Sequence, residues 1–338
     1  MTIDPARVRP TDAEPAGVGS EPVRARSRIA LGLSRFSGVY VLVALCIGFS
    51  IWLPDTFATV QNVKVVAQSQ AVTGLLALGL MIPLAAGVFD LSVAANMGLA
   101  SVVVIKLQAS GWNVVLACLV AIVGSAIVGV LNGAIITRFK VDSFIITLGM
   151  SSVLAAASYK VTNGQQIVDG ISSSFLKIGT ATWFGVPAPV FYFAIAAALI
   201  WFMLEHRPLG RVLFAVGGNR QAARLAGVRT DRMVFVSLVG GATLAGVAGV
   251  LLASELGVGD PTSGPPYLLP VFSAVFLGAT QIRPGRVNVV GTIISIYLLA
   301  VGVKGLQLAG APSYVSDLFN GLALIVAVSL AASERRRR

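Results

Sequence analysis

The chain is short of charge. Only 12% of its 338 residues are Asp, Glu, Lys or Arg, whereas soluble globular domains carry about 25%. Hydrophobic residues make up 56% of the chain, and the mean hydropathy is +0.86. So few charges could not cover the water-exposed surface of a soluble fold of this size. The composition therefore predicts an all-α polytopic membrane protein.

Residues that bind metals or act as nucleophiles are equally scarce. The two cysteines, Cys46 and Cys118, lie in apolar runs without ligand spacing, and the single histidine, His206, falls in a predicted loop. No Gly-Lys dipeptide occurs, which excludes a phosphate-binding P-loop, and there is no HExxH motif. We therefore expect no catalytic residue, no metal site and no cofactor bound by this chain, and we predict that it is not an enzyme.

The two ends differ from the apolar middle. Residues 1–36 are rich in Pro, Arg and acids and are predicted to form a disordered cytoplasmic tail, while 37–332 form the transmembrane domain. A signal peptide is the alternative at the N-terminus, but the run 37–53 is not followed by a small-residue cleavage site. The basic tail 333–338 resembles an anchor on anionic lipid more than a nucleic-acid patch, so no nucleic-acid partner is expected.

Apolar runs predict about ten transmembrane helices, since a helix needs about 20 apolar residues to cross the bilayer core. The runs are 37–53, 65–86, 90–108, 114–137, 143–162, 187–204, 232–254, 266–282, 287–308 and 314–332.

The basic residues indicate the orientation of these runs. With a cytoplasmic N-terminus, the inner segments are 1–36, 138–142, 205–231, 283–286 and 333–338. All lysines and arginines lie in these segments or at their edge, except Lys64, Lys106, Lys160, Lys177 and Lys304. Because inner loops attract Lys and Arg, we predict that both termini are cytoplasmic.

Asp90 is the only charged residue between Ala71 and Ile105. Gly87 allows a bend before it, so Asp90 is expected in the first turn of the next helix, capping its free N–H groups with help from Ser92. The alternative is a role in a transport path, because ionisable groups at membrane depth are commonly functional. Polar residues inside the runs are candidates for the same path, or else form hydrogen bonds between helices. The candidate path residues are Gln70, Asp90, Ser92, Asn96, Asn132 and Thr147.

Small residues recur at four-residue spacing in two of the runs. Gly129 and Gly133 form one such pair, and Ala242–Gly246 and Ala245–Gly249 form two more. This spacing predicts close helix packing within the membrane.

Acids are too few in these runs for a typical proton- or sodium-driven carrier, so energy is expected to enter from another polypeptide. The largest inner connection is the loop 205–231, in which 219–228 can form a short helix that Asn219 caps and Gly227 ends. Its alanines suit a groove in a partner and its arginines suit acidic partners. The alternative is a basic loop that lies on lipid.

Several blocks resemble a known family. "QAARLAG" (221–227) is similar to the coupling loop of bacterial ABC importer permeases. "GVFDLSVA" (87–94), "SFIITLGM" (143–150), "PLGRVLFAVGGNRQAARLAGV" (208–228) and "LGATQIRPGRVNVVGT" (277–292) resemble blocks of the ribose/xylose-type sugar permeases. The likeness covers roughly 65–330. Val88, Ala94, Asp142 and Ser143 depart from the family pattern, which weakens any assignment of the substrate.

This resemblance implies a permease domain over 37–332, in the bacterial inner membrane, that moves a monosaccharide or related polyol. It implies a cytoplasmic ABC ATPase that holds ATP and Mg, an extracytoplasmic substrate-binding protein and a second permease copy, identical or paralogous. The residues implied to couple the permease to the ATPase are Gly210, Arg211, Gly218, Asn219, Ala222, Ala223, Arg224 and Gly227. A branched-chain amino-acid permease and a stand-alone secondary carrier remain the alternatives.

Overall fold

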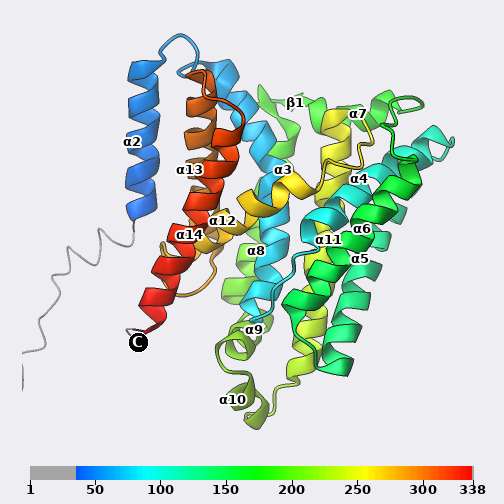
Figure 1. Cartoon of the computed structure of the whole chain (residues 1–338), viewed down its shortest axis with the longest axis vertical. Coiled ribbons are helices and arrows are strands. Elements are labelled where there is room, and N and C mark those ends of the chain that lie inside the picture. Colours follow the sequence, from blue (N-terminus) through cyan, green and yellow to red (C-terminus); the bar gives the residue numbers. More distant parts are fainter. Residues whose placement is uncertain (1–35, 337–338) are drawn as a thin grey trace, which may run out of the picture.

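The computed structural model of the protein describes residues 36–336, with side chains as far as residue 329 (Figure 1). Its helices are α2 (Ser37–Trp52), α3 (Val60–Ala85), α4 (Val93–Ala109), α5 (Val114–Phe139), α6 (Ser143–Thr162), α7 (Ser173–Thr180), α8 (Ala188–His206), α9 (Pro208–Gly218), α10 (Arg220–Leu225), α11 (Thr230–Leu256), the 3-10 turn η1 (Pro265–Tyr267), α12 (Leu268–Ala279), α13 (Val289–Leu308) and α14 (Tyr314–Arg336). The short strands β1 (Thr182–Trp183) and β2 (Val186–Pro187) pair antiparallel in a hairpin between α7 and α8.

Helices occupy all ten predicted apolar runs, and their bounds differ from the predicted ones by at most five residues. Six of them, α3, α5, α6, α8, α11 and α13, are long and apolar enough to cross a membrane by themselves. The apolar stretches of α2, α4, η1–α12 and α14 are shorter in the described part of the chain. The protein is thus an all-α polytopic membrane protein, as its composition predicts.

The apolar runs did not predict three elements, because these elements are too short to cross a membrane. α7 is an eight-residue amphipathic helix, and the β1–β2 hairpin follows it directly. α9 starts at Pro208, in the first helical turn, where proline is well tolerated because its missing N–H would have had no partner.

α11 lies at the centre of the bundle and packs against α3, α4 and α5. Small residues allow this close approach. A Cβ built on Gly129 of α5 would lie 2.7 Å from the carbonyl oxygen of Leu238, and one on Gly249 would lie 2.3 Å from that of Met97. The predicted small-residue pairs therefore sit at helix contacts.

The outward faces of α5, α6 and α8 carry exposed apolar side chains, which suits contact with lipid. These include Leu119, Ile127, Ile145, Val153, Ile195 and Leu199. In Figure 1, α2, α12, α13 and α14 form one side of the bundle, while α4, α5, α6 and α11 form the other.

α2 runs upwards in the view of Figure 1 and α14 runs back down, so both point their terminal ends towards the side that carries α10. The predicted disordered tail, 1–36, lies outside the described residues apart from Phe36. Of the predicted basic tail, 333–336 continue α14, and 337–338 lie outside the described residues.

Candidate functional site

The chain leaves helical geometry between α3 and α4. α3 ends at Ala85, Gly87 adopts a φ of +76°, and α4 begins only at Val93. The sequence predicted Asp90 in the first turn of α4, but Asp90 lies before this helix. Ser92 is the N-cap residue instead. The Asp90 carboxylate instead accepts hydrogen bonds from the backbone N–H of Ser92 at 3.0 Å and from its hydroxyl at 2.6 Å.

Hydrogen bonds from neighbouring helices fasten this segment, residues 86–92. The N–H of Phe89 donates to the Ser143 hydroxyl at 3.1 Å, and the N–H of Leu91 donates to the Thr147 hydroxyl at 3.0 Å. The Asn132 amide donates to the Ser92 hydroxyl at 2.9 Å. α6 thus supplies acceptors for backbone N–H groups that a helix would otherwise have paired within itself, and α5 holds the Ser92 side chain.

The predicted path residues separate into two groups. Asp90, Ser92, Asn96, Asn132 and Thr147 are buried and are hydrogen-bonded within the protein. They line neither of the two cavities described below, and their role in a transport path stays a prediction. Only Gln70 lines a cavity.

Two cavities flank η1–α12. The first, called here the α9 cavity, has a volume of about 820 Å³, and the second, the α13 cavity, has about 470 Å³. The α9 cavity is mostly apolar and is lined by Leu84, Gly87, Phe89, Leu91, Phe214, Gly217, Leu268, Phe272, Phe276 and Arg286, among others. The α13 cavity has a more polar lining, which includes Ser69, Gln70, Thr73, Tyr267, Lys304, Gln307 and Asn320.

η1–α12 contributes different side chains to each cavity. Leu268, Phe272 and Phe276 face the α9 cavity, whereas Tyr267 and Ala274 face the α13 cavity. The twelve residues of α12 extend about 18 Å at 1.5 Å per residue, less than the thickness of the bilayer core. Interrupted helices of this kind mark the transport site in many membrane carriers.

Stacked aromatic rings connect the 86–92 segment to α12. The rings of Phe89 and Phe276 lie 6.2 Å apart between centroids with an interplanar angle of 24°, and Phe276 stacks in turn on Phe272 at 6.1 Å. This contact joins two walls of the α9 cavity. Moving one of them would therefore disturb the other.

Arg286 connects a third wall. Its guanidinium lies 3.9 Å from the centroid of the Phe214 ring on α9 and donates to Glu205 at 3.1 Å. Arg283 forms a second ion pair with Glu205, at the end of α8. Burial lowers the pKa of the Arg286 guanidinium, and the cation is held by a carboxylate and an aromatic face.

The predicted short helix of the loop 205–231 exists as α10, and its caps are those expected. The Asn219 side chain accepts from the N–H of Ala222 at 2.9 Å. At the other end Gly227 has a φ of +84°, and the N–H groups of Gly227 and Val228 donate to Arg224 and Ala223, which is a Schellman motif. Asn219 also ends α9, so α9 and α10 share one residue as their only connection.

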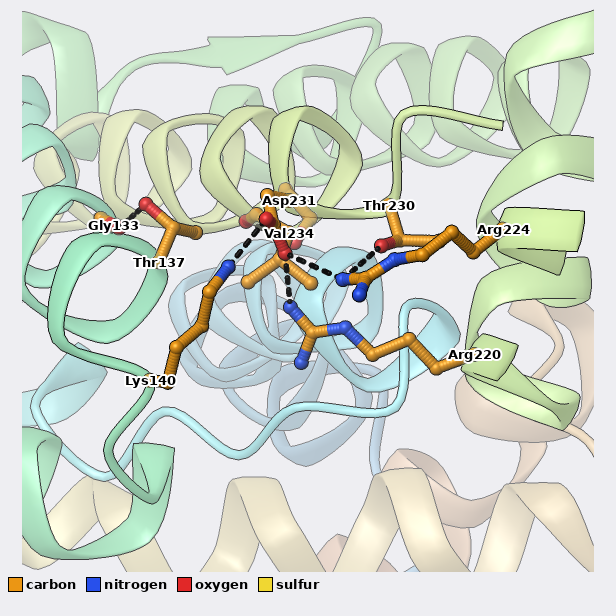
Figure 2. Close-up of polar contacts among 9 residues, drawn as sticks. Gly133, Thr137, Lys140, Arg220, Arg224, Thr230, Asp231 and Val234 are labelled. Carbon is orange, nitrogen blue, oxygen red and sulfur yellow. Dashed lines mark hydrogen bonds and ion pairs between the residues drawn. The ribbon is translucent and has the colours of Figure 1, made fainter. Parts of the chain in front are cut away.

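Asp231, the second residue of α11, holds α10 in place (Figure 2). It pairs with Arg220 at 2.8 Å and Arg224 at 3.6 Å, and it also pairs with Lys140 from the α5–α6 connection. Two of the arginines that were expected to meet an acidic partner are thus engaged within the chain. All four side chains are partly exposed, so the cluster orients α10 more than it stabilises the fold.

The predicted coupling residues occupy both faces of α9 and α10. Arg211, Gly218, Asn219, Ala222, Arg224 and Gly227 are exposed. Ala223, which was expected to face a partner, is instead buried at 6% exposure. Gly210 allows α9 to fold back on α8, because a Cβ there would lie 2.1 Å from the carbonyl oxygen of Leu204.

Sequence reasoning missed Glu205, Phe89, Phe276 and Asp231. The acids could have been noticed as rare carboxylates beside basic loops, but no local pattern marks an aromatic pair that joins residues so far apart. Within the described residues, no three of His, Cys, Asp and Glu gather where they could hold a metal ion.

An apolar helical bundle with two cavities on either side of an interrupted helix, and a capped helix projecting at one end, defines a multi-pass membrane transport component. Comparison with family models agrees: residues 63–328 match the family described as "branched-chain amino acid transport system / permease component". The chain belongs to this family of permease components of bacterial ABC importers, and it is a transport component and not a catalytic enzyme. It is a multi-pass protein of the bacterial inner membrane.

Similar curated proteins carry the names of sugar permeases. The ribose import permease protein RbsC of Bacillus subtilis is 32% identical over 301 residues, which cover 88% of this chain and 92% of that protein. The L-arabinose transport system permease protein AraH of Escherichia coli is 32% identical over 298 residues, covering 87% and 89%. The L-arabinose ABC transporter permease protein AraH of Azospirillum brasilense is 29% identical over 317 residues, covering 94% and 93%. No solved structure matches significantly.

Proposed function

We propose that this permease moves a monosaccharide or a related polyol into the cell. Relatives that match most of the chain are named for ribose and arabinose. The α13 cavity offers hydroxyl and amide groups from Ser69, Gln70, Thr73, Gln307 and Asn320, which suit a ligand rich in hydroxyl groups. The branched-chain amino-acid alternative has less support, because the similar curated proteins that match most of the chain are named for sugars.

The energy comes from a separate cytoplasmic ABC ATPase, which holds ATP and Mg and engages α10. The observation that carries this proposal is the exposure of α10: Leu225 is 90% exposed on a helix capped at both ends and braced by Asp231. A large apolar side chain presented in this way suits a groove in a partner. A stand-alone carrier would have no use for such a helix.

The proposal also covers the membrane crossings and the other partners of the importer. The chain crosses the membrane ten times with both termini in the cytoplasm, and the short helices α4 and η1–α12 complete their crossings with the non-helical segments beside them. A second permease copy completes the transport path, and an extracytoplasmic binding protein delivers the solute at the end of the bundle that carries α7.

Leu225→Asp tests the α10 assignment. A charge at the tip of α10 should abolish co-purification of the ATPase and ATP-dependent uptake in proteoliposomes, while the yield and the melting temperature of the permease stay the same. Val168→Asp adds the same charge at another exposed apolar residue, at the α7 end, and should retain ATPase binding. Normal ATPase binding by Leu225→Asp would refute the assignment.

A further inference from the structure

α9 ends against the turn that follows α3, and the two backbones touch. A Cβ built on Gly217 would lie 2.4 Å from the carbonyl oxygen of Ala85 and 2.9 Å from the nitrogen of Gly87. Conversely, a Cβ on Gly87 would lie 2.9 Å from the Cα of Gly217. Real Cβ atoms do not approach backbone atoms this closely, so only glycine fits at either position.

Only two residues separate Gly217 from the first residue of α10. Gly217 is followed by Gly218 and then by Asn219, the single residue that joins α9 to α10. A displacement of α10 therefore reaches Gly217 without a flexible linker between them. α10 is braced but not buried, so it can move only together with the elements fastened to it.

The other side of the contact leads to the cavity. Gly87 is the second residue of the 86–92 segment, from which Phe89 and Leu91 line the α9 cavity. Phe89 stacks on Phe276 of α12, the helix that separates the two cavities. The chain of contacts thus runs from Asn219 through Gly217 and Gly87 to Phe89 and Phe276.

We propose that the Gly217–Gly87 backbone contact transmits the movement of α10 to the wall of the α9 cavity, so that α9 and the 86–92 segment shift as one body. The inference rests on the proposed function, in which α10 engages the ATPase. Gly217 acts as a positioning residue: its backbone lines the α9 cavity, and its proposed role is the close contact with Gly87. Packed glycines suit this role because the contact is rigid and has no side chain that could yield.

Gly217→Ala tests the proposal. Gly217 lies in helical geometry without a positive φ, so alanine introduces no backbone strain of its own there. We expect ATP-dependent uptake to fall at least tenfold while the ATPase still co-purifies and hydrolyses ATP within twofold of the wild-type rate. Gly124→Ala on α5 is the matched control, because it is a helical glycine whose Cβ would meet nothing within 4 Å; it should leave uptake unchanged. Uptake by Gly217→Ala at the control rate would overturn the proposal.

A second measurement does not depend on that variant. Spin labels on Gly218→Cys and Phe89→Cys, with Cys46 and Cys118 replaced by serine, report the distance between α9 and the segment. We expect this distance to stay the same between the nucleotide-free complex and the ATP–vanadate complex, while the distance from Phe89 to a label on Val168→Cys changes. A change in the first distance would overturn the proposal even if Gly217→Ala fails to fold.

These outcomes separate the inference from the function on which it rests. If the wild-type chain shows no ATP-dependent uptake and no ATPase binding, the proposed function fails. If the wild type and Leu225→Asp behave as proposed but Gly217→Ala matches Gly124→Ala, only the coupling inference fails.

Discussion

At the scale of single residues, Asp90 shows how a carboxylate is accommodated in an apolar chain. It is 1% exposed, and both of its hydrogen bonds come from Ser92, which in turn accepts from Asn132. The group therefore stabilises the turn between α3 and α4.

Two substitutions of Asp90 should show whether its role in stability depends on its hydrogen-bond acceptor or on its charge. Asp90→Ala leaves the Ser92 N–H and hydroxyl without their acceptor, at a cost of about 1–3 kcal/mol for each buried group left unpaired. Asp90→Asn keeps an oxygen at the same place and should lose less stability. Thermal unfolding of the purified variants in detergent measures the difference, and equal melting temperatures for the two would contradict this role.

Glu205 is the second carboxylate whose partners define its role. Glu205→Ala would leave Arg283 and Arg286 facing each other without a counter-charge, and we expect a loss of about 1–2 kcal/mol, since the arginines are partly exposed. Melting temperatures at low and high salt check this prediction. Salt should reduce the loss by screening the two arginines, and a loss that salt does not change would point to packing instead of charge.

At the scale of elements, the interrupted helices matter most. α4 and η1–α12 start or end within the depth of the bundle, and the 86–92 segment meets α12 through Phe89 and Phe276. Short helices can shift without breaking a continuous hydrogen-bonded ladder. This makes η1–α12 the element best suited to open one cavity towards the other.

Phe276→Ala should therefore loosen the contact between α12 and the 86–92 segment, two walls of the α9 cavity. We expect leakage of labelled pentoses from proteoliposomes without ATP to rise several-fold, because the stacked contact with Phe89 is lost. Phe139→Ala, which removes a side chain exposed on α5, serves as the control for general destabilisation. Leakage equal to that of the control would show that this aromatic contact is not a barrier.

At the scale of the whole molecule, the described chain begins and ends on the side that carries α10. From the distribution of lysines and arginines we predict that this side is cytoplasmic. The β1–β2 hairpin, with Phe184 at its tip, lies towards the opposite end.

Cysteine labelling tests the orientation. In a chain without Cys46 and Cys118, Phe184→Cys should react with a membrane-impermeant maleimide in spheroplasts, since Phe184 is 99% exposed. Leu225→Cys should react only after the membrane is permeabilised. The reverse pattern would invert the topology and remove the basis for an ATPase at α10.

The sequence by itself determined the class of the molecule and the places of its helices. Every segment that crosses the lipid must be apolar and must pair its own backbone groups. Long apolar runs and few charges can therefore be recognised in the sequence without knowledge of how the helices pack. The caps of α10 were also readable, since Asn219 and Gly227 act on their own backbone neighbourhood. The resemblance of short blocks pointed to the family.

Only the tertiary structure determined which residues of separate elements contact one another. The hydrogen bonds that hold the turn around Asp90 come from side chains of α5 and α6 that are distant in sequence. The inward orientation of Ala223, the stacking of Phe89 on Phe276 and the fit of Gly217 against Gly87 depend in the same way on how separate elements meet. Local patterns report what a residue's neighbours along the chain require, whereas such contacts exist only once the helices have packed.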